Sequence, residues 1–417
     1  MLSSHNGLMT EDKNLSLVGG TTKQYIDNKA NIKFVFDSGA KQTQVLYEIY
    51  LNITMVISSL YKKIVIKVGS NVLTREDGML NISRMTHIVE QIAQLKKEGV
   101  QVILVTSGAV AAGRAEVEPL KKLDPVSSRQ LWSAVGQVKL INRYAELFQK
   151  QGLTCAQVLT TKENFGDRLH YLNMRNCMQT LLENEVIPIV NENDTISVTE
   201  LMFTDNDELS GLIASMMDME ALVILSNVDG VYTCAPDQPG SELIRTIHPN
   251  RSAEGISISA KKSNFGRGGM LTKYHIAVKL AGQGISVFIA NGFKEKILLD
   301  ILHGTSQTSF THFLPSDKKS SGVRKWLSHS DDFARGEVVI NEGARTALLS
   351  DRAVSLLMIG ITSVTGYFKE GDIVRIKDSE GNLLGLGKTS FSSDETIEEK
   401  GGKKAKPFIH YDYLYLI

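Results

Sequence analysis

Two lysines in this chain stand where an anion could meet them. Lys67 lies inside the apolar run from Ile64 to Val68, directly before Gly69 and Ser70. An unpaired ammonium in a buried strand is costly, so we expect something anionic at the end of this run. The alternative is an edge strand whose lysine reaches water. Lys273 ends the segment FGRGGMLTK, whose small residues let backbone N–H groups approach a phosphate near the start of a helix.

Carboxylates and amides gather in two further segments. NENDTIS contains Asp194, and TDNDELS contains Asp205, Asn206 and Asp207. These side chains suit a zwitterionic substrate, because amides donate to a carboxylate and carboxylates accept from an ammonium. The alternative is that they cap the start of a helix. The glycine-rich segment TSGAVAAG could hold a second anion, although a lone glycine-rich turn is more often only a turn.

Composition and motifs exclude several classes of protein. The 46 basic and 46 acidic residues cancel, so no overall field recruits nucleic acid or an anionic membrane. Neither GxxxxGK[ST] nor a GxGxxG that opens a first helix occurs. The three cysteines, Cys155, Cys177 and Cys234, lack metal-ligand spacing, and their odd number argues against a disulfide framework. Without an apolar stretch of roughly 18 residues or a secretory signal, we expect a cytoplasmic protein.

The elements that must position these residues follow an alternating pattern. Short β-branched runs alternate with amphipathic helical stretches from about residue 61 to residue 303, which is typical of an α/β fold with an open, mostly parallel sheet and helices on both faces. The expected strands are 64–68, 100–106, 155–159, 186–190, 221–226 and 285–290. The motifs follow the carboxyl ends of these strands or begin a helix beside them, so we expect them to converge on one edge of the sheet.

The rest of the chain divides into three parts. Residues 1–60 carry no such motif, and we expect an N-terminal extension that need not be ordered, with one strand at NIKFVF. Met55 offers a second start, which would give residues 1–54 no catalytic role. Residues 304–329 lack sustained periodicity and are interpreted as a linker. Residues 330–417 contain short glycine-punctuated strands, which predict a small β-rich domain.

These motifs resemble a known family. KVGSNVLT, VTSGAVAAGR, PIVNENDTIS, DNDELSGLIA, DGVYT and GRGGMLTK, in this order, are similar to the amino-acid kinase family and to its branch that phosphorylates glutamate. The tail resembles the PUA domain that often follows that kinase. The resemblance implies transfer of phosphate from ATP to the side-chain carboxylate of L-glutamate, which gives L-glutamyl 5-phosphate in the first step of proline biosynthesis. No His or Cys nucleophile is needed, because the acceptor carboxylate is already ionised at neutral pH.

The resemblance also implies roles for single residues. Lys67 and Lys273 would bracket the transferred phosphoryl group, and Asp207 would hold both lysines. The residues expected to bind the amino acid are Ser107, Gly108, Asp194, Asp205 and Asn206. Those expected to bind the nucleotide are Lys67, Gly69, Ser70, Ser226, Asn227, Arg267, Gly268, Gly269, Met270, Leu271, Thr272 and Lys273. No protein metal site is expected, because Mg²⁺ would be held mainly by the ATP phosphates.

The resemblance is incomplete at two places and leaves alternatives open. The family usually has Thr-Asp where this chain has Ser226 and Asn227, and a small Thr where it has Arg267, and both places belong to the expected nucleotide site. Another acidic amino-acid kinase of the same fold, or a catalytically relic RNA-binding or regulatory protein, would share much of the pattern. The implied partners are a second copy of the chain, a glutamyl-phosphate reductase and proline as a feedback inhibitor, whereas RNA and membranes are not expected.

Overall fold

The computed structural model describes residues 59–197, 203, 205–249, 269–304, 308–317, 322–350, 353–398 and 406–416, together with three strands within residues 13–37. The chain forms two compact units, residues 1–58 and 59–417. In the first, β1 (Lys13–Val18), β2 (Thr22–Asp27) and β3 (Ile32–Asp37) form an antiparallel sheet. β3 overlaps the strand expected at NIKFVF.

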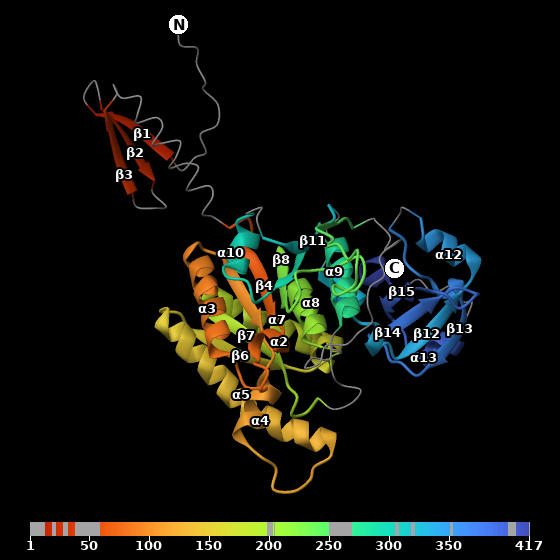
Figure 1. Ribbon diagram of the computed structural model, residues 1–417. Helices are drawn as coiled ribbons and strands as arrows, with labels where there is room; N and C mark the ends of the chain where they lie inside the picture. Colours follow the sequence, from red (N-terminus) through yellow and green to blue (C-terminus); the bar gives the residue numbers. More distant parts are fainter. Residues whose placement is uncertain are drawn as a thin grey trace. The chain divides into compact units, whose positions relative to one another are not determined.

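An eight-stranded sheet forms the centre of the second unit (Figure 1). Its order is β6-β7-β5-β4-β8-β10-β11-β9, with β4 (Lys63–Val68) between β5 and β8. The other strands are β5 (Gln101–Val105), β6 (Cys155–Thr160), β7 (Ile187–Glu192), β8 (Ala221–Ser226), β9 (Thr246–Ile247), β10 (Ser286–Asn291) and β11 (Phe310–Phe313). The strands from β6 to β10 in this order are parallel to their neighbours, and all six expected strands are confirmed.

Helices cover both faces of this sheet, as expected. One face packs against α3 (Ile82–Lys97), α5 (Pro125–Lys150) and α10 (Ile297–Leu302). The other packs against α7 (Arg168–Glu183), α8 (Asn206–Met216), α9 (Met270–Gly282) and α11 (Gly322–Ser328). The shorter helices are α2 (Ser70–Leu73), α4 (Ala109–Glu116) and α6 (Glu163–Gly166).

The alternation along β4 decides where Lys67 points. Ile64, Ile66 and Val68 belong to the core under α3, α5 and α10, whereas Val65 belongs to the core under α7, α8 and α9. Because successive side chains of a strand point to opposite faces, Lys67 shares the face of Val65 and is directed towards α8. β4 has a hydrogen-bonded neighbour on each side, so the edge-strand explanation of this lysine is wrong.

The prediction that residues 304–329 form a linker was wrong for much of that stretch. β11 pairs antiparallel with β10, and the short β9 pairs with β11. α11 then buries Trp326 and Leu327 in the core on the α8 face. The four-residue strand Phe310–Phe313 buries only alternate residues, and its pairing with β10 is a tertiary contact, so local periodicity carries little signal for it.

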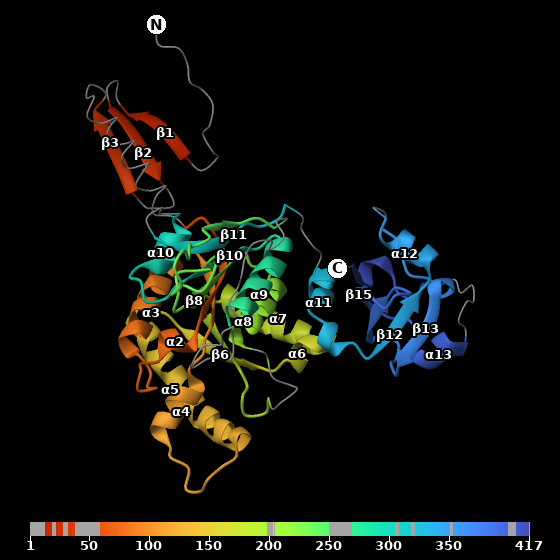
Figure 2. The same ribbon diagram turned by 45° about the vertical axis from the view of Figure 1, so that its right-hand side comes forward.

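The C-terminal residues form a second, five-stranded sheet of order β13-β12-β14-β15-β16, as the predicted β-rich domain requires (Figure 2). Its strands are β12 (Gly336–Ile340), β13 (Ile361–Gly366), β14 (Ile373–Lys377), β15 (Leu383–Lys388) and β16 (Leu414–Leu416), and its helices are α12 (Glu342–Leu348) and α13 (Ser393–Glu398). It has its own core around Phe368 and Phe408. Ile373 and Leu386, however, join the core cluster that contains Trp326 and Leu327.

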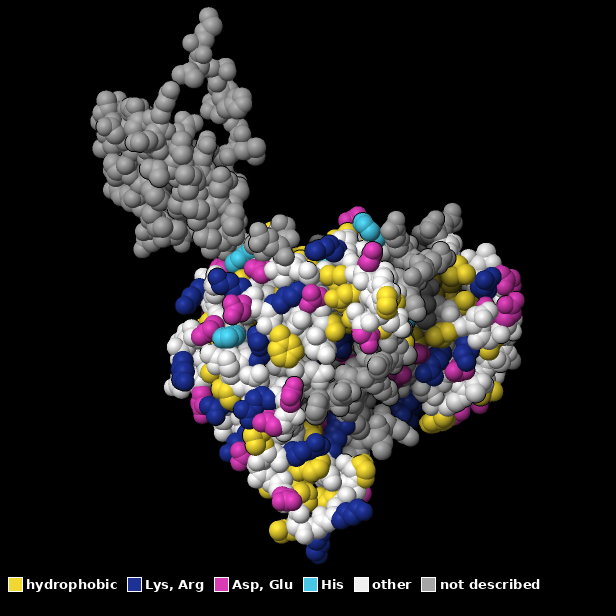
Figure 3. Space-filling view, viewed as in Figure 1, with side chains coloured by type: hydrophobic (Ala, Val, Ile, Leu, Met, Phe, Trp, Pro, Cys, Tyr) yellow, Lys and Arg dark blue, Asp and Glu magenta, His cyan; other side chains and the backbone are white. Residues whose placement is uncertain are grey.

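The distribution of surface charge and the character of the helices can be compared with the composition of the chain. On the face drawn in Figure 3, basic and acidic side chains are interspersed, in keeping with the net charge of zero. Among the described residues, no helix combines the length and the apolar character that crossing a bilayer would require.

Candidate active site

A cavity of about 830 Å³ opens where the parallel strands end. Loops and helix starts that follow several strands of the eight-stranded sheet meet there, as the positions of the motifs predicted. Asp207 lines it together with eleven of the residues expected to bind substrate or nucleotide: Lys67, Gly69, Ser70, Ser107, Gly108, Asp194, Asp205, Asn206, Ser226, Asn227 and Lys273. Motifs that lie up to about 200 residues apart in the chain therefore share one cavity, which is the usual ligand position in open α/β sheets.

The glycine-rich segment before α9 is only partly described. Arg267 and Gly268 lie outside the described residues. Gly269 precedes α9, and Met270, Leu271 and Thr272 lie in its first turn. Of the described residues in this segment, Lys273 is the one that lines the cavity. The nucleotide-binding role of the other residues therefore stays a prediction.

Both lysines contact Asp207. The Nζ of Lys67 lies 2.5 Å from Oδ1 of Asp207, and the Nζ of Lys273 lies 2.7 Å from Oδ2. Asp207 is in the first turn of α8 and is 1% exposed, while the two lysines come from β4 and α9. One buried carboxylate thus holds two ammonium groups side by side, which is the contact that the family resemblance implied. The group carries a net positive charge.

Burial and charge act in opposite directions on this group. Burial alone would raise the pKa of Asp207, but Lys67 and Lys273 outweigh it and lower the pKa to about 2. Burial also opposes the charge of Lys273, and Asp207 reverses this and raises the pKa of that lysine. Asp207 is therefore ionised and Lys273 is charged throughout the physiological pH range.

The two carboxylate oxygens of Asp205 have different surroundings. Its Oδ1 accepts from the backbone N–H groups of Asp207 and Glu208, at 2.8 and 3.0 Å, and so caps α8. The capping interpretation is thus right for this oxygen. Oδ2 is buried without a hydrogen-bond partner among the described residues. Burial, together with the charge of Asp207, raises the pKa of Asp205 to about 6.

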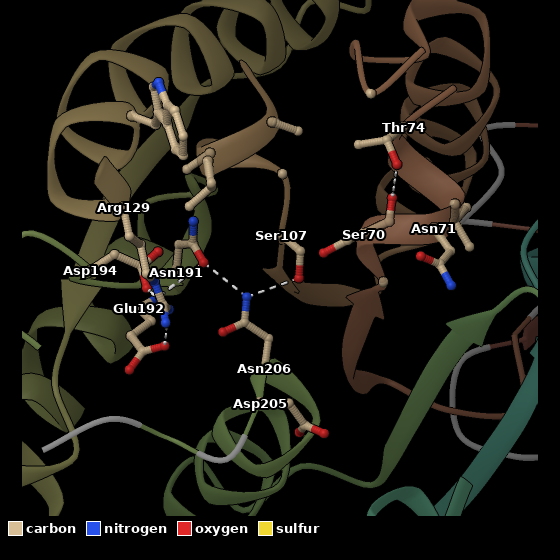
Figure 4. A pocket seen from close by; sticks show the side chains of 18 of the residues that line it. Ser70, Asn71, Thr74, Ser107, Arg129, Asn191, Glu192, Asp194, Asp205 and Asn206 are labelled. Carbon is tan, nitrogen blue, oxygen red and sulfur yellow. Dashed lines mark hydrogen bonds and ion pairs between the residues drawn. The ribbon is translucent and has the colours of Figure 1, made fainter. Parts of the chain in front are cut away.

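Asn206 links three segments that meet in the middle of the cavity. Its Nδ2 contacts the carbonyl oxygen of Thr106 at 2.7 Å, and Oγ of Ser107 and Oδ1 of Asn191 at 2.9 Å each (Figure 4). Gly108 precedes α4 with a φ of 103°, a left-handed conformation that favours glycine and lets the chain turn beside Ser107. The predicted amino-acid residues Ser107, Gly108 and Asn206 therefore lie together.

The structure adds residues to the site that the sequence did not indicate. Arg129, from the N-terminal part of α5, donates to the carboxylate of Asp194, and its Nη2 lies 3.6 Å from Oε2 of Glu192. Asn71, Arg114, Trp132 and Asn191 also line the cavity. Asn191 and Glu192 could have been found, because they belong to the same NEND motif as Asp194. For Arg129 the sequence carries no comparable signal.

Burial dominates the ionisation of the two acids beside Arg129. It raises the pKa of Glu192 to about 7, and the neighbouring charge of Asp194 adds to this effect. The pKa of Asp194 is also raised by burial, although Arg129 acts against the shift. A carboxyl group that titrates near neutral pH therefore lies at the edge of the cavity, which is typical of functional sites.

Comparison with known proteins agrees with this geometry. The model of the amino acid kinase family matches residues 62–291, and that of the PUA domain matches residues 336–410. A glutamate 5-kinase of Bacteroides thetaiotaomicron is 57% identical over 356 residues, which cover 85% of this chain and 99% of that protein. The chain belongs to the glutamate 5-kinase family. A second member, from Chlorobaculum tepidum, is 49% identical over 86% of this chain and 98% of its own.

Of the two departures from the family's motifs, the structure places the one at Ser226 and Asn227. Ser226 and Asn227 both line the cavity, and Oγ of Ser226 donates to Oδ1 of Asn227 at 3.4 Å. The cavity-lining residues, from Lys67 to Lys273, all fall within the match to the amino acid kinase family. Ser226 and Asn227 thus replace the family's usual Thr-Asp inside the cavity itself.

Proposed function

We propose that this protein transfers the γ-phosphoryl group of ATP to the side-chain carboxylate of L-glutamate. The product is L-glutamyl 5-phosphate, and the reaction is the first step of proline biosynthesis. The observation that carries this proposal is the group formed by Lys67, Asp207 and Lys273, with amides and carboxylates beside it in the same cavity. Phosphoryl transfer needs this combination of positive charge and exact positioning, and little covalent chemistry from the protein.

Each residue then has a definite task. An oxygen of the glutamate side chain attacks the γ-phosphorus, and the bond from that phosphorus to the β,γ-bridging oxygen breaks, which leaves ADP. The acceptor is ionised at neutral pH, so no general base is required. Lys67 and Lys273 stabilise negative charge on the transferred group, and Asp207 keeps them in place. Ser107 and Asn206 hold the amino acid next to this charge.

On the nucleotide side of the cavity, ATP would bind together with the Mg²⁺ held by its phosphates. A Cβ at Gly69 would lie 3.2 Å from the carbonyl oxygen of Leu225 and 3.5 Å from the Nζ of Lys67, so glycine leaves room beside that ammonium. Among the described residues, no cluster of three acidic, His or Cys side chains could hold a metal ion by itself. Mg²⁺ bound to the ATP phosphates would add positive charge there, with the buried Oδ2 of Asp205 as an available oxygen.

The test of the proposed function is release of ADP that depends on L-glutamate, with hydroxylamine to trap the acyl phosphate. L-Aspartate and N-acetyl-L-glutamate serve as competing acceptors, because they are substrates of kinases with the same fold. If the protein phosphorylates one of these acceptors and not glutamate, that acceptor is the substrate instead. Complete absence of turnover, with salt-sensitive RNA binding by residues 330–417, would favour the relic protein instead.

Substitution of Asn206 tests the amino-acid side of the cavity. Asn206→Ala removes the amide that holds Ser107 and, in this proposal, contacts the substrate, so we expect the KM for glutamate to rise roughly 10- to 150-fold, the equivalent of about 1.5 to 3 kcal/mol. The KM for ATP should change little. Asn227→Ala is the matched control on the proposed nucleotide side and should raise the KM for ATP instead. The opposite pattern would mean that the two sides are assigned the wrong way round.

The raised pKa of Glu192 predicts how glutamate binding depends on pH. Glu192 faces Asp194 and Arg129, and it accepts from the backbone N–H of Phe203. Its pKa of about 7 means that it loses a proton between about pH 6 and pH 8, and the ionised form attracts the substrate ammonium. We therefore expect the KM for glutamate to fall as pH rises, by at most about tenfold per pH unit. Glu192→Gln should flatten this profile, and an unchanged profile would contradict the assignment.

We infer the partners from the product and the family. An acyl phosphate hydrolyses readily, so a glutamyl-phosphate reductase should consume it soon after release. Proline, the end product, should inhibit the enzyme, and a homo-oligomer in the cytoplasm is its proposed form. Size-exclusion chromatography with light scattering, with and without proline, tests the assembly.

A further inference from the structure

An ion-pair group in the cavity has no part in the phosphoryl transfer itself. It consists of Arg129, Glu192 and Asp194. Arg129 donates to Asp194 and lies 3.6 Å from Glu192, and the three side chains are 24%, 4% and 9% exposed. Asp194 also accepts from Oγ of Ser133 at 3.4 Å. Two buried carboxylates therefore lie around one guanidinium group at the wall of the cavity.

The other cations of the cavity are engaged elsewhere. Among the described residues that line it, the cationic side chains are Lys67, Arg114, Arg129 and Lys273. Lys67 and Lys273 are paired with Asp207. The guanidinium of Arg114 lies over the ring of Trp132, 4.6 Å from its centroid. Arg129 is thus the cation that contacts the carboxylates of the NEND motif.

The positions of these groups give the substrate a direction. In Figure 4, Arg129, Glu192 and Asp194 lie together on one side, and Ser70 and Asn71 lie on the opposite side. Ser107 and Asn206 lie between them. Asn206 precedes Asp207 in α8, so the middle of the cavity adjoins the lysine pair. An acceptor carboxylate at the lysines would leave the rest of the amino acid directed towards Arg129.

We propose that Arg129 binds the α-carboxylate of the amino-acid substrate, beside Asp194 and Glu192, which face its ammonium group in the proposed function. This inference rests on the proposed function. A guanidinium group binds a carboxylate through two parallel hydrogen bonds, which fixes orientation as well as charge. The substrate supplies one negative and one positive group, so each buried charge keeps an opposite partner. A ligand with only one of these groups would leave a buried charge unpaired, which is strongly unfavourable.

The consequence is selection for an amino acid that has both α-groups. 4-Aminobutanoate retains the reacting carboxylate and the ammonium of glutamate but lacks the α-carboxylate. Glutarate retains both carboxylates but lacks the ammonium. A site built to bond a polar group rejects an analogue that lacks the group far more strongly than an apolar pocket rejects a missing methylene. Arg129 should therefore govern the choice between L-glutamate and 4-aminobutanoate, and Asp194 the choice between L-glutamate and glutarate.

The experiment compares kcat/KM for L-glutamate and 4-aminobutanoate in the full-length protein. Arg129→Met should lower kcat/KM for glutamate about 30- to 300-fold, mainly through KM, and leave the value for 4-aminobutanoate within about threefold. Arg114→Met, the other arginine of the cavity, is the control and should keep the wild-type preference. Arg129→Lys should retain part of it, and added guanidinium ion should partly restore glutamate binding in Arg129→Ala. A merely structural arginine would instead lower kcat/KM for glutamate and 4-aminobutanoate alike.

The outcomes separate this inference from the proposed function. Wild-type turnover of glutamate together with an undiminished preference in Arg129→Met or Arg129→Lys would overturn the role of Arg129 alone. If wild type phosphorylates L-aspartate instead of glutamate, the proposed function fails, and L-aspartate against 3-aminopropanoate then tests Arg129 in the same way. A wild-type protein without turnover of any amino acid would overturn both.

Discussion

Lys67→Met is expected to lower turnover about 100- to 1000-fold while the protein remains folded. Methionine keeps the apolar length of the side chain within β4, so the packing around Val65 should survive. The substitution removes only the ammonium that contacts Asp207 at 2.5 Å, and with it the charge placed to stabilise the transferred phosphoryl group. Turnover at saturating ATP and glutamate measures the effect, and circular dichroism checks the fold.

A surface lysine provides the control for this result. Lys97, at the exposed C-terminal end of α3, lies outside the cavity, so Lys97→Met should leave turnover unchanged. Turnover close to that of wild type in Lys67→Met would show that the lysine has only a packing role. The proposed contact between Lys67 and the transferred phosphoryl group would then be wrong.

Asp207→Asn is expected to reduce turnover by a comparable factor, about 100-fold, although Asp207 itself contacts no phosphate in the proposed reaction. The amide keeps the shape of the carboxylate but no longer holds two ammonium groups together. Because Lys67 acts through the position that Asp207 gives it, the double variant Lys67→Met/Asp207→Asn should lose far less than the product of the two single losses.

The double-mutant cycle gives this prediction its sharpest form. Kinetics of the wild type, the two single variants and the double variant are measured at saturating substrates. Losses that multiply fully would mean that the two residues act independently, in spite of their ion pair. The intact fold of each variant is checked by its thermal unfolding, because loss of a buried charge partner is itself destabilising.

The sequence predicted the sheet from local patterns, whereas the lysine pair was expected from the family resemblance. The strands from β4 to β10 that were expected are runs of β-branched residues long enough to recognise, and the motifs beside them must meet at one edge of a parallel sheet. This pattern placed the motifs at one edge, and the family resemblance implied that Asp207 would hold Lys67 and Lys273 there. The paired strands β9 and β11 are two and four residues long, and α11 has seven residues, so their existence depends on tertiary packing.

Arg129 could not be found in the same way. It stands near the start of a 26-residue amphipathic helix, where an arginine at helical spacing ordinarily faces water. Only the tertiary fold brings that helix over the NEND segment, which is 65 residues further along the chain. Glu192 was visible in the motif, but its burial, and hence its raised pKa, depends on Phe203 and on packing that periodicity does not record.

We expect the apolar contact between the C-terminal sheet and α11 to couple the unfolding of the two sheets. Leu386, which is 1% exposed, belongs to the same core cluster as Trp326 and as Leu209 in α8. Beside this cluster, Lys162 forms ion pairs with both Glu208 of α8 and Asp332. Unfolding of one sheet would remove part of the core that packs against the other, so calorimetry should record a single unfolding transition for residues 59–417. Leu386→Ala should lower the temperature of this whole transition. A substitution in β15 would therefore also lower the temperature at which α8, the helix that contains Asp207, unfolds.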